Sequence, residues 1–173
     1  MDAANLGLLA LRAVIGVTMI AHGYNHIWGG GKIAGTAGWF ESLGMKPGRL
    51  HAWLASLTEL VAGAMLVAGL GTPLAAGACA GVMLVAWMTN HRTNGFFIFR
   101  PGEGYEYVMN LFVASLAVAC IGAGEWSLDR AFGIDDSLDG WTGAAIGAVV
   151  GIGGALTLLA VFWRPERKEP SAG

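Results

Sequence analysis

Ionisable side chains inside apolar segments are the residues of this chain best suited to chemistry. His22 and His26 are four residues apart, so on a helix they share one face. Glu106 and Asn110 repeat that spacing, and Glu59 lies within another apolar run. Because charge inside a bilayer is costly, such residues indicate a functional site. The spacing suits a ligand pair, a proton relay or a polar clamp; the alternative is that these side chains only join helices.

The elements that must position these residues are five apolar stretches, each about as long as a bilayer is thick. The chain has 173 residues, of which 55% are hydrophobic and 13% charged, whereas soluble domains contain about 25% charged residues. The sequence therefore predicts an all-α membrane protein, a five-helix transmembrane bundle forming one domain over residues 1–173. By the length that a bilayer requires, its helices are expected at about 5–27, 52–71, 73–91, 105–123 and 141–163.

The order of these segments predicts that the polar residues lie in one layer of the bundle. The first helix brings His22 to the side of the membrane where the second helix begins, and Glu59 lies about two turns inside that helix. The fourth helix starts on the same side, at Glu106. Because desolvated polar groups need partners, we expect His22, Glu59 and Glu106 to line one interior cavity.

Two loops on that side could cover the layer, and both contain aromatic residues. Trp39 lies in the first loop, while Phe96 and Phe97 lie in the loop before the fourth helix. Aromatic side chains beside a polar cluster suit a flat amphiphile such as a quinone; the alternative is interfacial anchoring. We predict catalytic or headgroup-orienting roles for His22, Glu59 and Glu106, and quinone contacts for His26, Trp39, Phe96, Phe97 and Asn110.

Several short motifs, in order along the chain, resemble the DoxX family of small membrane proteins. They are Ala21-His22-Gly23, Gly38-Trp39-Phe40, Glu59, Asn94-Gly95-Phe96-Phe97, Tyr105-Glu106-Tyr107 and Trp126-Ser127-Leu128-Asp129. The resemblance covers roughly residues 5–130, and the order of the motifs is more specific than any one of them. Family members typically have four helices, so the predicted helix at 141–163 is a departure, as is His26, where the family often has a basic residue.

The resemblance implies a quinone-linked redox setting, because related proteins include a small subunit of thiosulfate:quinone oxidoreductase. The leading hypothesis is an accessory or catalytic subunit of quinone-linked redox metabolism, with quinone as the bound cofactor. The alternative is a non-enzymatic scaffold that assembles a redox or stress-defence complex. Ligation of haem or a metal by His22, His26 and His91 is a less favoured third hypothesis, and no metal site is assigned.

Basic residues are distributed asymmetrically between the two sides of the predicted bundle. Eight of the ten Lys and Arg residues lie in the loops near 46 and 92 or in the C-terminal tail, whereas Arg130 alone lies on the opposite side. The positive-inside rule therefore places the C-terminus in the cytoplasm and the N-terminus outside a cell inner (plasma) membrane. Membrane lipid is then the surrounding partner, and no nucleic-acid partner is expected.

Other residues have structural interpretations. Gly143, Gly147 and Gly151 form one ridge of the last helix, which we expect to dock on the other helices or to contact a second copy or another protein. Arg12, alone in the outer half of the first helix, is expected to make a structural pairing or to snorkel. His51 and His91 at helix ends are expected to be interfacial, and Cys79 and Cys120 to be small core residues.

Overall fold

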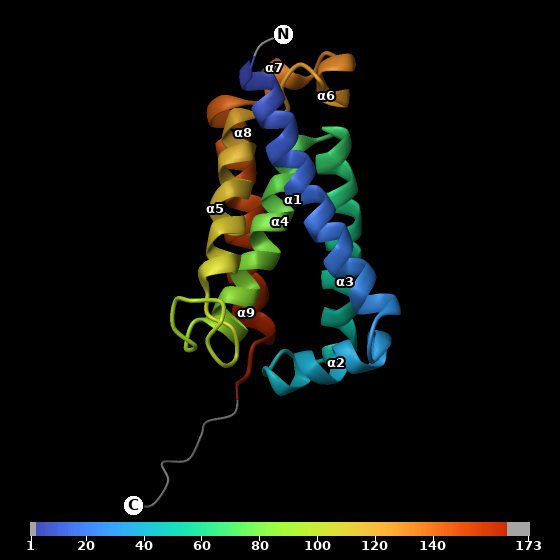
Figure 1. Ribbon diagram of the computed structural model, residues 1–173, viewed down its shortest axis with the longest axis vertical. Helices are drawn as coiled ribbons and strands as arrows, with labels where there is room; N and C mark the ends of the chain where they lie inside the picture. The colour runs from blue at the N-terminus through green and yellow to red at the C-terminus, as the bar shows by residue number, and fades with distance from the viewer. Residues whose placement is uncertain (1–2, 166–173) are drawn as a thin grey trace, which may run out of the picture.

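The computed structural model describes residues 3–165, which form helices and connecting loops without a β-strand. The long helical segments are α1 (Ala3–Trp28), α3 (Gly48–Ala68), α4 (Thr72–Ala86) with the π-helical turn η1 (Trp87–His91), and α5 (Glu106–Ile121). The last is α8 (Gly140–Gly147), continued by the π-helical η2 (Ala148–Gly153) and α9 (Gly154–Phe162). Short helices α2 (Lys32–Ser42), α6 (Leu128–Ala131) and α7 (Asp135–Leu138) lie at the two ends of the bundle (Figure 1).

Four helical segments are long and apolar enough to cross a membrane. They are Ala3–Trp28, Gly48–Ala68, Thr72–His91 and Gly140–Phe162. These segments confirm the prediction of an all-helical membrane protein. α5 is apolar but shorter, with 16 residues, so a fifth membrane span stays a prediction.

The second predicted helix begins earlier than its hydropathy suggests. α3 starts at Gly48, directly after Pro47, so His51 lies inside the helix rather than before it. Its end is set by Gly69, whose φ of 67° is a left-handed conformation that glycine adopts without steric cost. The earlier start has a functional consequence, because it turns His51 toward the interior, where only 2% of its surface is exposed.

Glycines allow close helix contacts. A Cβ atom on Gly16 of α1 would lie 2.5 Å from the carbonyl oxygen of Gly63 in α3, and one on Gly63 would lie 2.6 Å from the carbonyl oxygen of Gly16. In the second contact, a Cβ on Gly151 of η2 would lie 2.7 Å from the carbonyl oxygen of Gly77 in α4. A Cβ on Gly143 or Gly147 would instead lie 2.7 Å or less from atoms of Ala119 in α5. The glycine ridge predicted in the last helix is therefore used within the chain, to dock that helix on α5 and α4.

The end of α9 is tied to the segment that follows α2. The indole Nε1 of Trp163 donates to the carbonyl oxygen of Leu43 at 2.9 Å, and the backbone N of Arg164 donates to that of Gly44 at 2.8 Å. α2 itself runs across the same end of the bundle, beneath the point where the α1–α3 pair diverges from α4, α5 and α9 (Figure 1). One end of the bundle is thus closed by α2 and held there by the C-terminal segment.

Arg12 joins three parts of the chain near the opposite end of the bundle. Its Nη1 donates to the carbonyl oxygens of Leu66 at 2.9 Å and Val67 at 3.1 Å, and its Nη2 donates to that of Trp126. The first two carbonyls belong to the last turn of α3, where a helix dipole favours a cation. The prediction of a structural pairing for Arg12 is confirmed.

Asp129 has the complementary role at the start of α4. Its two carboxylate oxygens accept from the backbone N of Gly71 at 2.6 Å and of Thr72 at 2.9 Å. Because these N–H groups have no partner within their helix, a buried carboxylate there satisfies donors that would otherwise be lost. The α5–α6 connection is therefore anchored on the α3–α4 turn.

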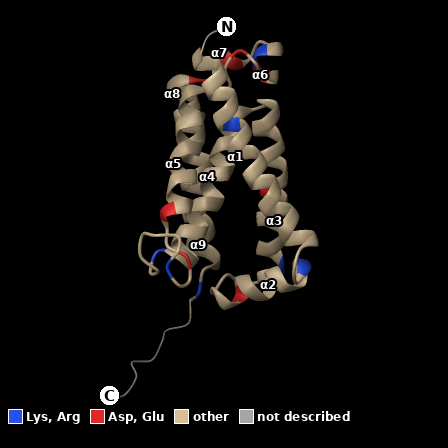
Figure 2. Cartoon of the chain, in the orientation of Figure 1, with Lys and Arg blue, Asp and Glu red and all other residues tan. Residues whose placement is uncertain are grey.

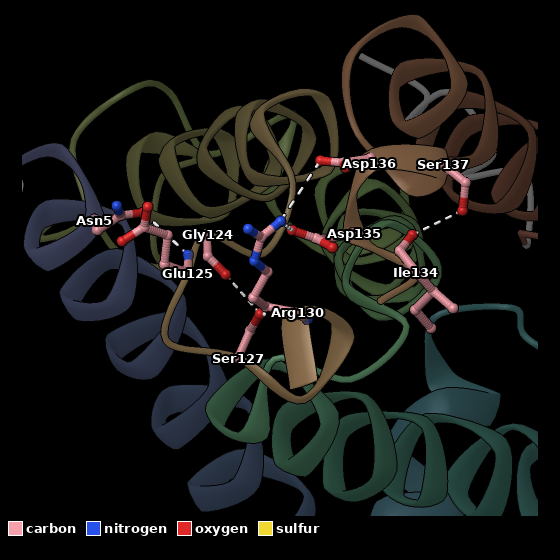
Figure 3. Close-up of polar contacts among 9 residues, drawn as sticks. All are labelled: Asn5, Gly124, Glu125, Ser127, Arg130, Ile134, Asp135, Asp136 and Ser137. Carbon is pink, nitrogen blue, oxygen red and sulfur yellow. Dashed lines mark hydrogen bonds and ion pairs between the residues drawn. The ribbon is translucent and has the colours of Figure 1, made fainter. Parts of the chain in front are cut away.

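Beyond this anchor, exposed polar contacts order the acidic end of the molecule (Figure 3). Arg130 Nη1 lies 3.0 Å from Asp135 and 3.9 Å from Asp136. Its hydrogen bond to Asp135, and then the charges of both carboxylates, raise the pKa of Arg130. In the same region the Asn5 side chain accepts from the backbone N of Glu125, which ties α1 to this loop.

Candidate functional site

A cavity of about 450 Å³ lies between the α1–α3 pair and the group formed by α4, η1, α5, η2 and α9, with α2 across its end. Most of its wall is apolar. The polar side chains that line it come from several elements: His22, His26, His51, Thr58, Glu59, Thr89, Asn90, His91, Glu103 and Tyr107. The predicted layer of polar residues is therefore built around a real interior space.

His26 and Glu59 form the charged centre of the cavity. His26 Nδ1 lies 3.1 Å from Glu59 Oε2, and Glu59 is 3% exposed. α1 and α3 approach closely at Gly23, where a Cβ would lie 2.7 Å from the carbonyl oxygen of Ser56, and this brings the two side chains together. The two atoms are close but not aligned as a hydrogen bond, so each keeps the capacity to bond a third group.

His22 presents its ring to the cavity one turn deeper in α1. Its Nδ1 lies 2.9 Å from the carbonyl oxygen of Thr18, one turn back in the same helix. The ring stacks on Tyr107 of α5, with centroids 5.9 Å apart and planes 23° apart. The two rings thus lie face to face at the cavity wall, one from α1 and one from α5.

His51 is the buried histidine that sequence reasoning assigned no functional role. Its ring lies 5.0 Å from that of Phe162 and 6.4 Å from that of Phe40, measured between centroids. Its Nε2 is buried and makes no hydrogen bond within the described residues. His51 is therefore packed between helices rather than exposed at a helix end, because α3 begins at Gly48 and carries the ring inward.

His91 is also buried, but both of its ring nitrogens are paired. Nδ1 lies 2.8 Å from the carbonyl oxygen of Glu103, and Nε2 lies 3.2 Å from the side-chain nitrogen of Asn90. Both histidine and asparagine belong to η1, and π-helical turns are frequent at functional sites. His91 is thus a fixed part of the cavity wall rather than an interfacial side chain.

Four of the predicted site residues lie in the cavity wall, namely His22, His26, Trp39 and Glu59. Glu106 does not: its Oε2 accepts from the backbone N of Ile98 at 3.2 Å, and the side chain helps to hold the loop before α5. The expectation that Glu106 shares this cavity is wrong. Successive helix residues point about 100° apart, and Tyr107, the next residue, faces the cavity instead.

The remaining predicted contacts also lie outside the cavity. Asn110 is exposed, and its amide donates to the carbonyl oxygen of Glu106 in the preceding turn. Phe96 and Phe97 are exposed in the loop before α5, where Phe96 packs edge-on against Tyr105. The first predicted covering loop therefore contributes to the cavity through α2, whereas the second contributes Glu103 rather than its phenylalanines.

The site has been described without a metal ion and without either cysteine. Within residues 3–165, no group of three or more His, Cys, Asp or Glu side chains is placed to hold a metal ion. Cys79 is a buried free thiol, as expected for a core residue, whereas Cys120 is exposed on the surface of α5.

Residues 7–92 match the family model described as DoxX. No curated protein and no solved structure matches the chain. The matched region extends from α1 through η1, so it includes His22, His26, His51 and Glu59. The cavity walls supplied by α5, η2 and α9 lie beyond it.

Proposed function

Because this chain belongs to the DoxX family, we propose that it is an integral membrane component of quinone-linked redox metabolism whose cavity binds a quinone headgroup. In this proposal His22 and Glu59 orient the headgroup, and His26 and Trp39 contact it. Tyr107 supplies the aromatic surface opposite, in the place that sequence reasoning gave to Glu106.

One observation supports the proposal above the others. Among residues 3–165, three buried polar atoms of residues that line the cavity make no aligned hydrogen bond: His26 Nδ1 and Glu59 Oε2, which face each other at 3.1 Å, and His51 Nε2. Leaving a buried polar group unpaired costs about 1–3 kcal/mol. A ligand with polar groups on an apolar ring would recover that cost, and the cavity volume falls within the usual range for small-molecule sites.

We further propose that the cavity end of the molecule faces the cytoplasm. Figure 2 shows Lys and Arg gathered near α2 and the loop before α5, and acidic residues gathered around α7. The described basic residues at the cavity end are Lys32, Lys46, Arg49, Arg92, Arg100 and Arg164; Arg167 and Lys168, counted in the sequence argument, lie outside the described residues. This asymmetry supports a cytoplasmic C-terminus in the plasma membrane.

α5 is proposed as a fifth span, although it is shorter than the other four. It runs alongside α4 over most of the length of the bundle (Figure 1). Its 16 residues rise about 24 Å, and the adjoining residues at both ends complete the crossing. An odd number of spans agrees with termini on opposite sides, and Figure 1 shows that α1 begins and α9 ends at opposite ends of the bundle.

The experiment that tests quinone binding is extraction and mass spectrometry of lipids from protein purified in mild detergent. Wild-type protein should retain quinone, and His22→Ala should lower the quinone-to-protein ratio several-fold, because it removes half of the stacked surface and a polar ring. Glu106→Gln is the matched control, since it changes a group at a similar depth outside the cavity. Equal retention in wild type and His22→Ala would contradict the assignment.

A scaffold that assembles a redox or stress-defence complex is the second candidate, and one observation favours it. The segment 96–99 exposes four consecutive apolar side chains at the basic end, and Phe99 is 79% exposed. Aromatic residues beside arginine are frequent in protein interfaces. If the purified protein contains no quinone and Glu59→Gln complements a deletion strain fully, the scaffold is the better description.

A further inference from the structure

The hydrogen bonds around the cavity determine which ring nitrogens of two histidines carry a proton. Nδ1 of His22 faces the carbonyl oxygen of Thr18, and Nδ1 of His91 faces that of Glu103. A carbonyl oxygen only accepts, so each Nδ1 must be the donor. In the neutral ring Nε2 is then an acceptor, which explains why the His91 Nε2 takes a hydrogen bond from the Asn90 amide.

Other side chains of the wall also use their donors within the protein. The Thr89 hydroxyl donates to the carbonyl oxygen of Val85 at 2.8 Å. The Asn90 amide nitrogen is directed to His91. After these bonds are made, the hydroxyl oxygen of Thr89 and the Nε2 of His22 are left as acceptors.

Glu59 adds the strongest acceptor. An ionised carboxylate has no donor, and its Oε2 is buried without a hydrogen bond. His26 Nδ1 lies 3.1 Å from Glu59 Oε2, and one proton shared between these two atoms leaves the other lone pairs of the carboxyl group as acceptors. A ligand that bonds to Glu59 must therefore supply a hydrogen-bond donor.

Few donors remain on the wall to balance these acceptors. The hydroxyls of Tyr107 and Thr58 can donate or accept, the Asn90 amide keeps one further N–H, and His51 Nε2 takes whichever role its ring tautomer allows. The Trp39 indole is a donor, but it belongs to an exposed side chain. Among the groups of the wall whose role is fixed by their other bonds, acceptors (Glu59, His22 Nε2 and the Thr89 hydroxyl oxygen) therefore outnumber donors.

This imbalance discriminates between the two redox forms of a quinone. The oxidised form has carbonyl oxygens, which only accept, whereas the reduced form has two hydroxyl groups, which donate. We propose that the cavity selects the reduced, hydroxyl-bearing form, with one hydroxyl donating to Glu59 and the ring lying against His22 and Tyr107. The inference rests on the proposed function. A tenfold preference for the reduced form raises the midpoint potential of the bound two-electron couple by about 30 mV.

The test measures the affinity of purified wild-type protein for two matched probes under anaerobic conditions. The probes are a decyl-substituted benzoquinone and the corresponding hydroquinone, and the readout is quenching of tryptophan fluorescence. We expect the hydroquinone to bind at least about tenfold more tightly, because the quinone leaves buried acceptors unpaired. A redox-inert pair, a decyl phenol and its methyl ether, should show the same order and excludes electron transfer as the cause.

The variant Glu59→Gln preserves shape and supplies an amide donor. It should bring the two affinities toward equality, whereas Glu106→Gln should keep the wild-type preference. If Glu59→Gln does not fold, the comparison of phenol and ether on wild-type protein tests by itself whether the cavity prefers a ligand with a hydroxyl donor.

The outcomes distinguish a failure of the preference for the reduced form from a failure of quinone binding itself. If none of the four probes binds, the proposed quinone site fails and the inference with it. If the quinone binds as tightly as the hydroquinone or more tightly, the inference is overturned while the quinone site stands. An unchanged preference in folded Glu59→Gln would overturn the role assigned to that carboxylate.

Discussion

At the scale of single residues, His51 and His91 show how two buried histidines of one cavity differ. Both ring nitrogens of His91 have partners, whereas His51 leaves Nε2 without one. A paired histidine stabilises the fold, while an unpaired one costs stability unless a ligand completes it. The pair therefore allows structural and binding roles to be separated by experiment.

Replacing His51 by Phe should raise stability and lower ligand retention together. Phenylalanine fits the aromatic surroundings of Phe40 and Phe162 and removes the unsatisfied Nε2, and it also removes the hydrogen bond of the ring to the Lys46 backbone. Because an unsatisfied buried polar atom costs about 1–3 kcal/mol and a hydrogen bond contributes about 1 kcal/mol, the free energy of unfolding should rise by up to about 1 kcal/mol. Thermal unfolding in detergent and quinone content after purification measure the two effects. His91→Phe is the comparison, since it breaks two hydrogen bonds and should destabilise by about 1–3 kcal/mol. A loss of stability in His51→Phe would contradict the assignment.

Sequence reasoning found the depth of the site residues but not their direction around each helix. His22, His26 and Glu59 were predicted together because the order of the segments fixes depth. Glu106 was misplaced because depth does not say which face looks inward. The sequence carries no signal that corrects it, because valine occurs both on the inward face of α5, at Val108, and on its exposed face, at Val113.

At the scale of elements, close glycine contacts decide how the helices around the cavity are spaced. α1 and α3 meet at Gly16 and Gly63 and again at Gly23, and this pairing brings His26 to Glu59. Away from that contact the pair diverges from α4 and α9, which leaves room for the cavity. The spacing of the glycines thus sets the position of the charged pair.

Gly16→Ala should loosen this packing. Its Cβ would lie 2.5 Å from the carbonyl oxygen of Gly63, which is too close without a backbone shift, so we expect a destabilisation of about 1–3 kcal/mol. Thermal unfolding monitored by circular dichroism measures it. Gly7→Ala, on the same helix, has no atom within 4 Å of the new Cβ and should be neutral or slightly stabilising. Equal stability of both variants would show that the contact is not tight.

The fifth segment illustrates what hydropathy and glycine spacing predict well. Its span and its docking ridge followed from sequence, and the structure places that ridge against α5 and α4. Its contribution to the cavity could not be predicted, because Val150, Ala155 and Leu158 are ordinary apolar residues whose role comes only from the neighbours they meet. The hydrogen bond from the Trp163 indole to the Leu43 carbonyl oxygen could not be predicted either, since every residue has a backbone carbonyl and the sequence does not mark which one accepts.

At the scale of the whole molecule, charge divides the bundle into a basic end with the cavity and an acidic end held by Arg12 and Asp129 (Figure 2). The acidic end joins α1, α3, α4 and the α5–α6 connection through buried hydrogen bonds. Among residues 3–165, buried polar atoms without a hydrogen bond occur at both ends, on Arg12 and Thr72 at the acidic end and on His26, His51 and Glu59 at the basic end, but only the latter three residues line the cavity. Stability and binding are thus assigned to opposite ends of the molecule.

Orientation is tested by cysteine labelling in intact cells, in a background where Cys79 and Cys120 are replaced by alanine. A cysteine at position 135 should react with a membrane-impermeant maleimide, and a cysteine at position 46 should react only after the cells are opened. Both positions lie near the ends of the bundle, so each serves as the control for the other. Labelling of position 46 in intact cells would reverse the proposed orientation.

The account depends most on the claim that the cavity holds a quinone headgroup, and photo-crosslinking tests it most directly. Protein in detergent is irradiated with an azido-benzoquinone that carries a decyl chain, with or without excess unlabelled quinone, and the adducts are mapped by peptide mass spectrometry. We predict adducts in the peptides of α1 and α3 that contain His22, His26, His51 and Glu59, and their loss in the presence of competitor. Adducts confined to the outward face of α5 around Glu106 and Asn110, or adducts that competitor does not reduce, would contradict the claim.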